Sequence, residues 1–310
     1  MFWWTGAEVM SMYCRRMFFI IGSARSGTTL LRLILNAHPD VAVPPESRFI
    51  TELWQGEEEV HVDDLLHRLE RHRLFQVWGL DTEEVKQELG TSPRQRYADV
   101  MEAVYKAWAR SKEKTIWGDK TPRYVENILL LSRLWPEAKF IHQIRDGRNV
   151  VLSYADVPFG PKTLGKAADL WKRRVEQGLA HGRPLGPDRY MEIRYEEFVS
   201  DTPNMTKRLC DFLGIEFHPD MLDYVEKSRT DILPRAARYN PNVTKPPTSS
   251  LRSWENQMTD KQVEMFEAVA GDTLDMLEYP RRFENPSFSA KLKASMSKAG
   301  LPVGRMESSK

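Results

Sequence analysis

The sequence predicts an α/β fold in three layers, a sandwich in which helices cover both faces of a central, mostly parallel sheet. Short apolar runs alternate with segments of helical periodicity, a pattern typical of parallel strands joined by right-handed crossovers. Residues 17–22, MFFIIG, form the first predicted strand, and a helical pattern begins at Thr28. A chain of 310 residues can bury one such core and still carry insertions.

The remaining elements repeat this plan. Residues 41–46, VAVPPE, are a second short strand, whose prolines prevent further pairing. Residues 114–121 contain a brief strand and turn before a helix that begins at Thr121-Pro122. Residues 138–154 again run strand, Asp-Gly turn, helix, and residues 189–214 add a strand and a helix with Gly214 near its end.

The domain organisation follows from these patterns. Residues 1–280 are expected to form a single domain, in which residues 52–114 are an inserted helical cap that shapes a binding pocket. From residue 281 to 310 the chain is rich in Ser and Lys, with seven Lys or Arg against two Glu. We expect this polar tail to be poorly ordered.

Composition limits the partners. With 45 Lys and Arg against 44 Asp and Glu, the chain has no overall field for nucleic acid or an anionic membrane, so any anion site is local. Charged residues interrupt the aromatic amino terminus, and no integral membrane segment is expected. The two cysteines, Cys14 and Cys210, form no metal or redox motif. We therefore expect a reducing, cytoplasmic location.

A glycine-rich loop follows the first strand. Residues 22–29, GSARSGTT, fit G-x-x-x-x-G-x-[ST] between a buried strand and a helix, the context of a phosphate loop. Main-chain N–H groups and the helix amino terminus favour an anion there. Thr28 stands where the ATP-binding form has its lysine, and Arg25 offers a planar fork suited to phosphate or sulfate. The residues themselves predict an anion site that is not built for ATP, or else an ordinary strand-to-helix turn.

Residues 18–41, FFIIGSARSGTTLLRLILNAHPDV, resemble the 5′-phosphosulfate loop of the sulfotransferases that use 3′-phosphoadenosine-5′-phosphosulfate (PAPS). The resemblance implies a fold like that of the P-loop NTPases, PAPS as co-substrate, 3′-phosphoadenosine-5′-phosphate (PAP) as product, and no required metal. It also implies that the loop residues hold the 5′-phosphosulfate, namely Arg25, Ser26, Gly27, Thr28 and Thr29.

A second anion site is predicted on the strand and helix of residues 138–154. Arg145 comes at the carboxyl end of the strand, where open α/β sheets bind ligands, and Ser153 lies about two helical turns later. Alternatives are a salt bridge of Arg145 with Asp146 or with another carboxylate of the crevice, and a solvent-facing Ser153. The pair is similar to the family's 3′-phosphate segment, which implies that both residues bind that phosphate. Arg148 is expected to be a surface or helix-start charge.

Three further residues are nucleotide candidates by resemblance. Tyr195 matches a family position near the adenosine, with core packing as the alternative. Arg252 resembles the basic loop that closes over the nucleotide, and Lys245 competes with it for that role.

Glu46 is the candidate catalytic base. It follows a predicted strand, where burial in a crevice would raise its pKa toward working pH. The alternative is a carboxylate that caps a helix start. The segment PESR is similar to the Glu-x-Arg segment of tyrosylprotein sulfotransferases and related bacterial enzymes, which implies that Glu46 is the base and that Arg48 orients the acceptor or the base.

Lys120 is the candidate cation for the leaving phosphate, with Arg25 as a further catalytic cation. It lies between a strand and a capped helix, and a surface pair with Asp119 is the alternative. The segment GDKTP resembles one that recurs in bacterial-type sulfotransferases.

The predicted activity is in-line transfer of a sulfonyl group from PAPS to an acceptor hydroxyl on a small molecule, glycan or peptide. Such a reaction needs positioning and electrostatic stabilisation rather than a covalent intermediate. Two other activities are possible on this fold: an ATP-dependent phosphotransferase and a non-catalytic nucleotide-binding module.

Overall fold

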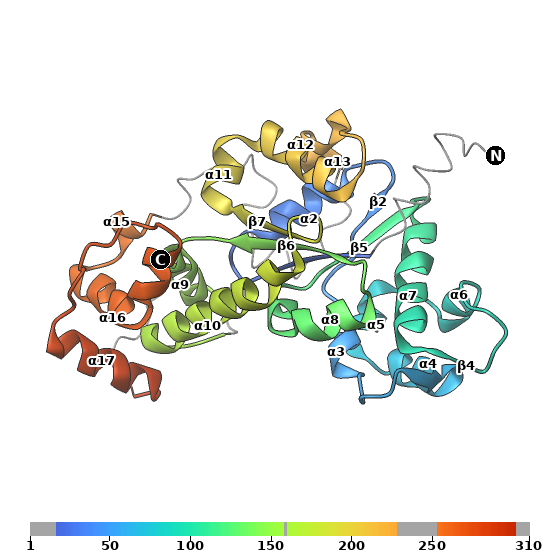
Figure 1. The fold of residues 1–310 in the computed structure, drawn as a ribbon, viewed down its shortest axis with the longest axis horizontal. Helices are drawn as coiled ribbons and strands as arrows, with labels where there is room; N and C mark the ends of the chain where they lie inside the picture. The colour runs from blue at the N-terminus through green and yellow to red at the C-terminus, as the bar shows by residue number, and fades with distance from the viewer. Residues whose placement is uncertain (1–16, 158–159, 228–252, 302–310) are drawn as a thin grey trace.

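The centre of the molecule is a five-stranded parallel sheet with strand order β2-β5-β1-β6-β7 (Figure 1). The structure, a computed structural model, describes residues 17–157, 160–227 and 253–301. All four strand pairs in the sheet are parallel, as the alternation of strands and helices predicts. The strands are β1 (Phe18–Gly22), β2 (Val41–Ala42), β5 (Ile116–Lys120), β6 (Lys139–Ile144) and β7 (Tyr190–Arg194).

Strand β1 shows why the fold has three layers. Its side chains are buried on both faces, with Phe18 and Ile20 in one hydrophobic cluster and Phe19 and Ile21 in another. Because successive side chains of a strand point to opposite faces, such a strand needs a helical layer on each side. The first cluster is covered by α2 (Thr28–Asn36), α11 (Tyr195–Ser200), α12 (Thr202–Leu213), the turn η3 (Pro219–Met221) and α13 (Tyr224–Lys227).

The second face is covered by the predicted insert and the segment after β5. This layer comprises α3 (Phe49–Glu52), α4 (Val62–Glu70), α5 (Arg73–Trp78), α6 (Thr82–Lys86), α7 (Tyr97–Ser111), η1 (Pro122–Asn127) and α8 (Ile128–Leu134). The Phe49 ring lies 5.0 Å from that of Trp78. The insert therefore shares one core with the sheet. It is mostly helical, but it also contains an antiparallel pair, β3 (Glu59–His61) and β4 (Arg94–Arg96), that the sequence analysis did not predict.

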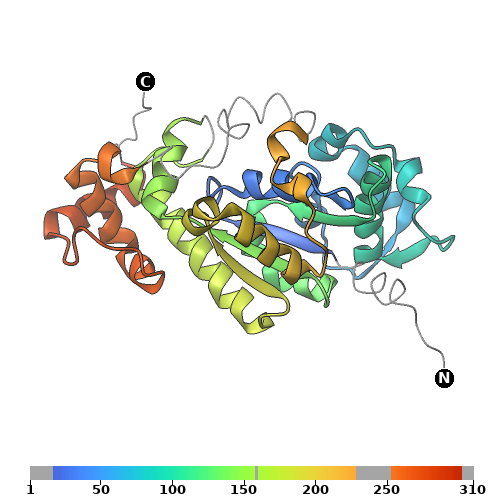
Figure 2. The same cartoon turned by 90° about the horizontal axis from the view of Figure 1, so that it is seen from above.

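A third cluster lies at the end of the molecule opposite the insert, as Figures 1 and 2 both show. It involves α9 (Gly147–Ala155), α10 (Leu164–Gly182), α15 (Trp254–Gln257) and α16 (Asp260–Met276), and the turn η2 (Arg183–Leu185) ends α10. No helix in the described segments has the length and hydropathy to cross a bilayer.

The expectation of a poorly ordered tail from residue 281 needs correction. Part of it forms α17 (Phe288–Lys298), which packs on α10 and α16 (Figure 2). Ser297 is fully buried: its hydroxyl accepts a hydrogen bond from the Gly165 N–H at 2.9 Å, and its carbonyl accepts one from the Thr163 hydroxyl at 2.8 Å. Small residues on one side of α17, Ala290, Ala294 and Ser297, allow this close approach. The helix is thus held by packing that a count of polar residues does not reveal.

The strand order places a topological switch point at the edge of the sheet where the ligand crevice was expected. After β1 the chain crosses to β2 on one side, whereas after β6 it crosses to β7 on the other. The carboxyl ends of β1 and β6 therefore flank a topological switch point, where open α/β sheets bind ligands. In register, Gly22 pairs with Gln143, and Ile20 pairs with Lys120 on the other neighbour, β5. Residues after Gly22, Gln143 and Lys120 all emerge at this edge.

Candidate active site

The phosphate loop joins β1 to α2 through two residues in left-handed backbone conformations. Arg25 has φ +74° and Gly27 has φ +95°. Gly27 permits this conformation without strain, and a Cβ there would overlap the Tyr195 ring. Gly27 is the N-cap of α2, and no side chain caps the helix. The helix amino terminus thus offers main-chain N–H groups and the positive end of its dipole at the crevice.

The buried hydroxyl of Ser26 indicates whether this loop fits the 5′-phosphosulfate. Its side chain is only 1% exposed, and among the described residues its hydroxyl has no hydrogen-bond partner. A buried hydroxyl without a partner is costly. An anion held by the neighbouring N–H groups would give that hydroxyl an acceptor. The loop chemistry therefore fits the group that the resemblance implies.

The structure brings the two predicted anion motifs together. The Arg25 Nε donates a hydrogen bond of 2.8 Å to the Ser153 Oγ, although 128 residues separate them. Ser153 lies on α9 and is 3% exposed, so the solvent-facing alternative is wrong. The loop after β1 and the helix after β6 thus share one polar contact inside the crevice.

Arg145 lies on the same side of the sheet as the phosphate loop. Its guanidinium carbon is 4.3 Å from the centre of the Tyr195 ring, the ring that packs against Gly27. This cation–π contact holds the planar guanidinium beside the loop. Tyr195 belongs to the core and also faces both anion motifs, so its two predicted positions are compatible.

Arg148 lies in the first turn of α9, as one predicted alternative had it, but it is not a surface charge. It is fully buried, and its Nη2 and Nε donate to the two carboxylate oxygens of Asp146 at 2.8 and 3.0 Å. Its Nη1 donates to the buried Glu267 at 2.8 Å, and its guanidinium lies 3.7 Å from the Trp254 ring centre. The long-range partner Glu267, 119 residues away, could not be found from local sequence. Asp146 therefore pairs with Arg148, and the predicted alternative of an Arg145–Asp146 bridge is wrong.

Glu46 and Lys120 form an ion pair at the same edge of the sheet. The Lys120 Nζ lies 2.9 Å from the Glu46 Oε1; the lysine side chain is 7% exposed and the glutamate side chain 41%. The alternative pairing of Lys120 with Asp119 is wrong. The Glu46 carboxylate does not cap α3. The N-cap of that helix is Arg48, whose side chain makes no capping hydrogen bond. The two predicted catalytic groups are therefore in direct contact, 74 residues apart in the chain.

The pKa of Glu46 differs in direction from the expectation. Burial acts to raise it, but the charge and hydrogen bond of Lys120, with the charges of Arg48 and Arg32, hold the pKa below its usual value. The expected rise followed from burial alone, whereas the lysine partner lies 74 residues away in the chain. Glu46 is thus a carboxylate at neutral pH, the form able to accept a proton.

Arg32 is a site residue that the sequence analysis missed. It lies on α2, is 5% exposed, and donates from Nε to the Val43 carbonyl at 2.9 Å. Its position on an otherwise apolar helix was the available signal. Arg48, predicted to orient the acceptor or the base, is half-buried with φ +55°, an uncommon backbone conformation for a residue with a side chain.

Two predicted residues, Arg252 and Lys245, lie outside the described residues. Among the residues that are described, no group of three His, Cys, Asp or Glu side chains is arranged to hold a metal ion.

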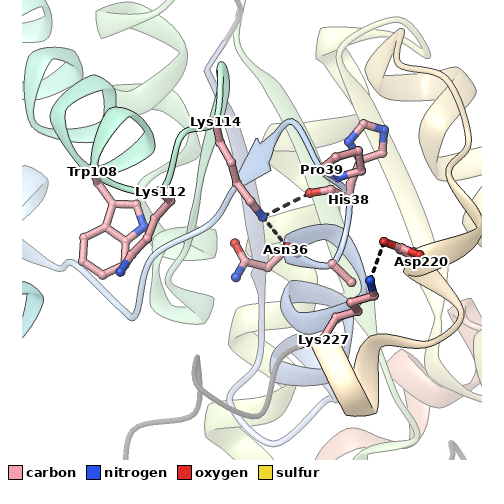
Figure 3. Close-up of a pocket in the computed structure, with 9 residues that line it drawn as sticks. Asn36, His38, Pro39, Trp108, Lys112, Lys114, Asp220 and Lys227 are labelled. Atoms are coloured by element: carbon pink, nitrogen blue, oxygen red, sulfur yellow. Dashed lines mark hydrogen bonds and ion pairs between the residues drawn. The ribbon is translucent and has the colours of Figure 1, made fainter.

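A separate hollow of about 320 Å³ lies at the opposite edge of the sheet, where β2 and β5 begin (Figure 3). Its cations already have structural partners. Lys114 donates to the carbonyls of Asn36, His38 and Val41 at 2.5, 3.1 and 2.9 Å, and so caps the carboxyl terminus of α2. Lys227 pairs with Asp220 at 2.9 Å. This hollow lies away from the edge of the sheet at which Glu46 and Lys120 meet.

Comparison with known proteins agrees with this geometry. The sequence profile of the sulfotransferase family matches residues 18–219. Protein-tyrosine sulfotransferase 1 of Danio rerio is 26% identical over 280 residues, which cover 87% of this chain and 74% of that protein. The Drosophila melanogaster protein-tyrosine sulfotransferase is 26% identical over 250 residues, 77% of this chain and 47% of that protein. The chain thus spans about half the length of the latter.

Solved structures share the fold. The sulfotransferase domain of the Synechococcus PCC 7002 olefin synthase has a TM-score of 0.55 at 24% identity, over 79% of this chain and 89% of that one. The sulfotransferase domain from the curacin biosynthetic pathway has a TM-score of 0.59 at 22% identity, over 86% and 99%. The predicted P-loop-like α/β fold is confirmed. With its phosphate loop, parallel sheet and matching profile, the chain belongs to the sulfotransferase family, the PAPS-dependent enzymes of sulfonyl transfer.

Proposed function

We propose that this protein transfers the sulfonyl group of PAPS to an acceptor hydroxyl, with Glu46 as the base and Lys120 as the cation for the leaving phosphate. The contact of 2.9 Å between these side chains, at the carboxyl ends of the strands beside the phosphate loop, carries the proposal. A carboxylate and an ammonium group in contact can accept a proton and offset negative charge within one small volume.

The proposed reaction is a displacement at sulfur. Glu46 takes the acceptor hydroxyl proton, the acceptor oxygen forms a bond to sulfur, and the bond from sulfur to the phosphate oxygen breaks. Lys120 and Arg25 offset charge on the departing phosphate, which leaves as part of PAP. Ser26, Gly27, Thr28 and Thr29 would hold the 5′ end, and Arg145 and Ser153 the 3′-phosphate. The buried positions of Ser26 and Ser153 and the bond from Arg25 to Ser153 support this assignment.

A peptide tyrosine is the acceptor class that we propose first. The support is the 26% identity to two proteins named as protein-tyrosine sulfotransferases. Sugar hydroxyls and small-molecule alcohols are the other acceptor classes to be compared. Labelled sulfonyl transfer to each class, measured with purified protein and PAPS, will rank them, and no transfer to tyrosine peptides beside efficient transfer to an alcohol would overturn the choice.

Nucleotide binding tests the donor. PAP should raise the melting temperature without Mg²⁺, and ATP should not. An ATP-dependent phosphotransferase predicts the reverse, but it needs a cation at position 28 and an acidic residue free for Mg²⁺. Thr28 occupies that position, and both carboxylate oxygens of Asp146 are bonded to Arg148.

The remaining alternative is a non-catalytic module that binds the nucleotide. It predicts that replacing the base changes nothing measurable. Glu46→Ala should instead abolish transfer and leave PAP affinity within about twofold, because in the proposed mechanism Glu46 acts on the acceptor and not on the nucleotide. A cytoplasmic location stays a prediction.

A further inference from the structure

A buried hydroxyl cluster connects the loop of Glu46 to the end of strand β5. Ser47, between Glu46 and Arg48, is fully buried. Its main-chain N–H donates to the Thr121 Oγ1 at 3.0 Å, and its own hydroxyl lies 3.3 Å from that oxygen and 2.8 Å from the Tyr124 hydroxyl. Thr121 follows Lys120 directly. The residue after the proposed base is therefore bonded to the residue after the proposed leaving-group cation.

The segment that carries Glu46 depends on such contacts because strand pairing ends early. Strand β2 contains only Val41 and Ala42, and Pro44 and Pro45 have no N–H to donate to a neighbouring strand. Side-chain contacts hold the rest: Val43 through Asn36 and Arg32, and Ser47 through Thr121. The main chain on the carboxyl side of Glu46 is thus held at Ser47, where the N–H donates to the Thr121 hydroxyl and the side chain contacts the Tyr124 hydroxyl.

On the other side of Lys120, Asp119 connects strand β5 to the insert. Asp119 is fully buried, and its Oδ2 accepts a hydrogen bond of 2.8 Å from the Tyr105 hydroxyl. Tyr105 lies on α7, the longest helix of the insert, and is also fully buried. Lys120 is therefore flanked in the chain by two residues, Asp119 and Thr121, whose side chains are bonded to other elements.

We propose that Thr121 is a positioning residue for the reaction, with Ser47 and Asp119 as its supports: it sets the distance between the Glu46 carboxylate and the Lys120 ammonium group. The inference rests on the proposed roles of those two groups. It also assigns the insert a task besides acceptor binding, because Tyr105 on α7 holds Asp119. A displacement of about 1 Å at reacting groups can cost about 100-fold in rate, so loss of the hydroxyl should reduce turnover without removing any group that reacts.

The test compares Thr121→Val with Thr121→Ser and with Thr206→Val. Valine keeps the size of threonine and removes the acceptor for the Ser47 N–H, whereas serine restores it. Thr206 is a fully buried threonine on α12, outside the site, whose hydroxyl donates to the Thr202 carbonyl at 2.7 Å. It therefore controls for the general cost of losing a buried hydroxyl.

The readouts are kcat, PAP affinity, melting temperature and a crystal structure of each variant. We expect Thr121→Val to lower kcat about 10- to 100-fold, with PAP affinity within about twofold of wild type. In its crystal structure the Nζ of Lys120 and the Oε1 of Glu46 should no longer be in contact. Thr121→Ser should recover most of kcat, and Thr206→Val should keep it. Wild-type kcat in Thr121→Val, or an equal loss in Thr206→Val, overturns the positioning role.

Glu46→Gln, measured beside these variants, separates this inference from the proposed function. An active Glu46→Gln enzyme overturns the assignment of the base and the positioning role with it. An inactive Glu46→Gln enzyme beside a fully active Thr121→Val enzyme overturns the positioning role alone.

Discussion

The Arg25 guanidinium donates through Nε to the Ser153 hydroxyl at 2.8 Å, so one hydrogen bond joins the loop after β1 to the helix after β6. These segments are the two halves of the nucleotide site that the sequence predicts. Because Ser153 is buried, its hydroxyl orients Arg25 inside the crevice rather than toward solvent. In the proposed site this pair therefore links nucleotide recognition to catalytic charge.

Ser153→Ala should weaken PAP binding about tenfold or more, since it removes a hydrogen bond to a charged phosphate and releases Arg25. Calorimetry with PAP measures the loss. Adenosine 5′-phosphosulfate, which lacks the 3′-phosphate, is the control ligand, and its affinity should fall by a smaller factor than that of PAP, because only the release of Arg25 affects it. Equal losses for the two ligands would contradict the placement of the 3′-phosphate at Ser153.

Arg148→Met should destabilise the fold by about 3–5 kcal/mol, because it leaves the buried carboxylates of Asp146 and Glu267 without their cation. Urea unfolding measures this change. Arg133→Met is the matched control, since the Arg133–Glu58 pair is 62% and 60% exposed and should contribute only about 0–1 kcal/mol. Similar losses of unfolding free energy in the two variants would show that the buried ion pairs stabilise the fold no more than the exposed pair does.

Lys120→Met should raise the pKa of Glu46. Burial raises that pKa, and the lysine is the main group that opposes it, so removal of the cation leaves burial with less opposition. NMR titration of ¹³C-labelled glutamate follows the carboxyl directly. The expected turnover loss is about 100-fold or more, as for other groups that stabilise transition-state charge. Lys112→Met, an exposed lysine beside the opposite hollow, should change neither quantity.

Asp119→Asn should remove a pH dependence of stability. Burial raises the pKa of Asp119 from 3.8 to about 6, while the hydrogen bond from Tyr105, the nearby hydroxyls of Ser47 and Thr121 and the charge of Lys120 act against it. A carboxyl whose pKa is higher in the folded state binds more protons there than in the unfolded state between pH 4 and 6. Its contribution to stability is therefore largest below pH 4 and falls as pH rises through 6.

Urea unfolding of both proteins at pH 4 and pH 7 checks this sign. The stability of Asp119→Asn relative to wild type should increase by about 3 kcal/mol over that range, from about 1.4 kcal/mol for each pKa unit. A constant difference would mean that Asp119 titrates normally in the folded protein.

Local sequence was sufficient for the fold class, and it also named the candidate site residues. The apolar run of β1, the glycine loop and the helix from Thr28 interact with near neighbours, so their spacing is read directly from the chain. Parallel strands then bring their carboxyl ends to one edge, and for that reason Arg25, Glu46, Lys120 and Arg145 could be expected in one crevice. The resemblance to sulfotransferases provided the identity of the predicted ligand, PAPS.

Tertiary structure alone decided which charges meet. The partner of Lys120 is Glu46 and not Asp119, and the partner of Asp146 is Arg148 and not Arg145. Burial and opposing charges then set the pKa direction of Glu46. Likewise, α17 exists because small residues let it pack on α10 and α16. Spacing along a chain determines periodicity and chain direction, whereas the energy of an ion pair depends on distance and solvent exposure, which only the packed elements define.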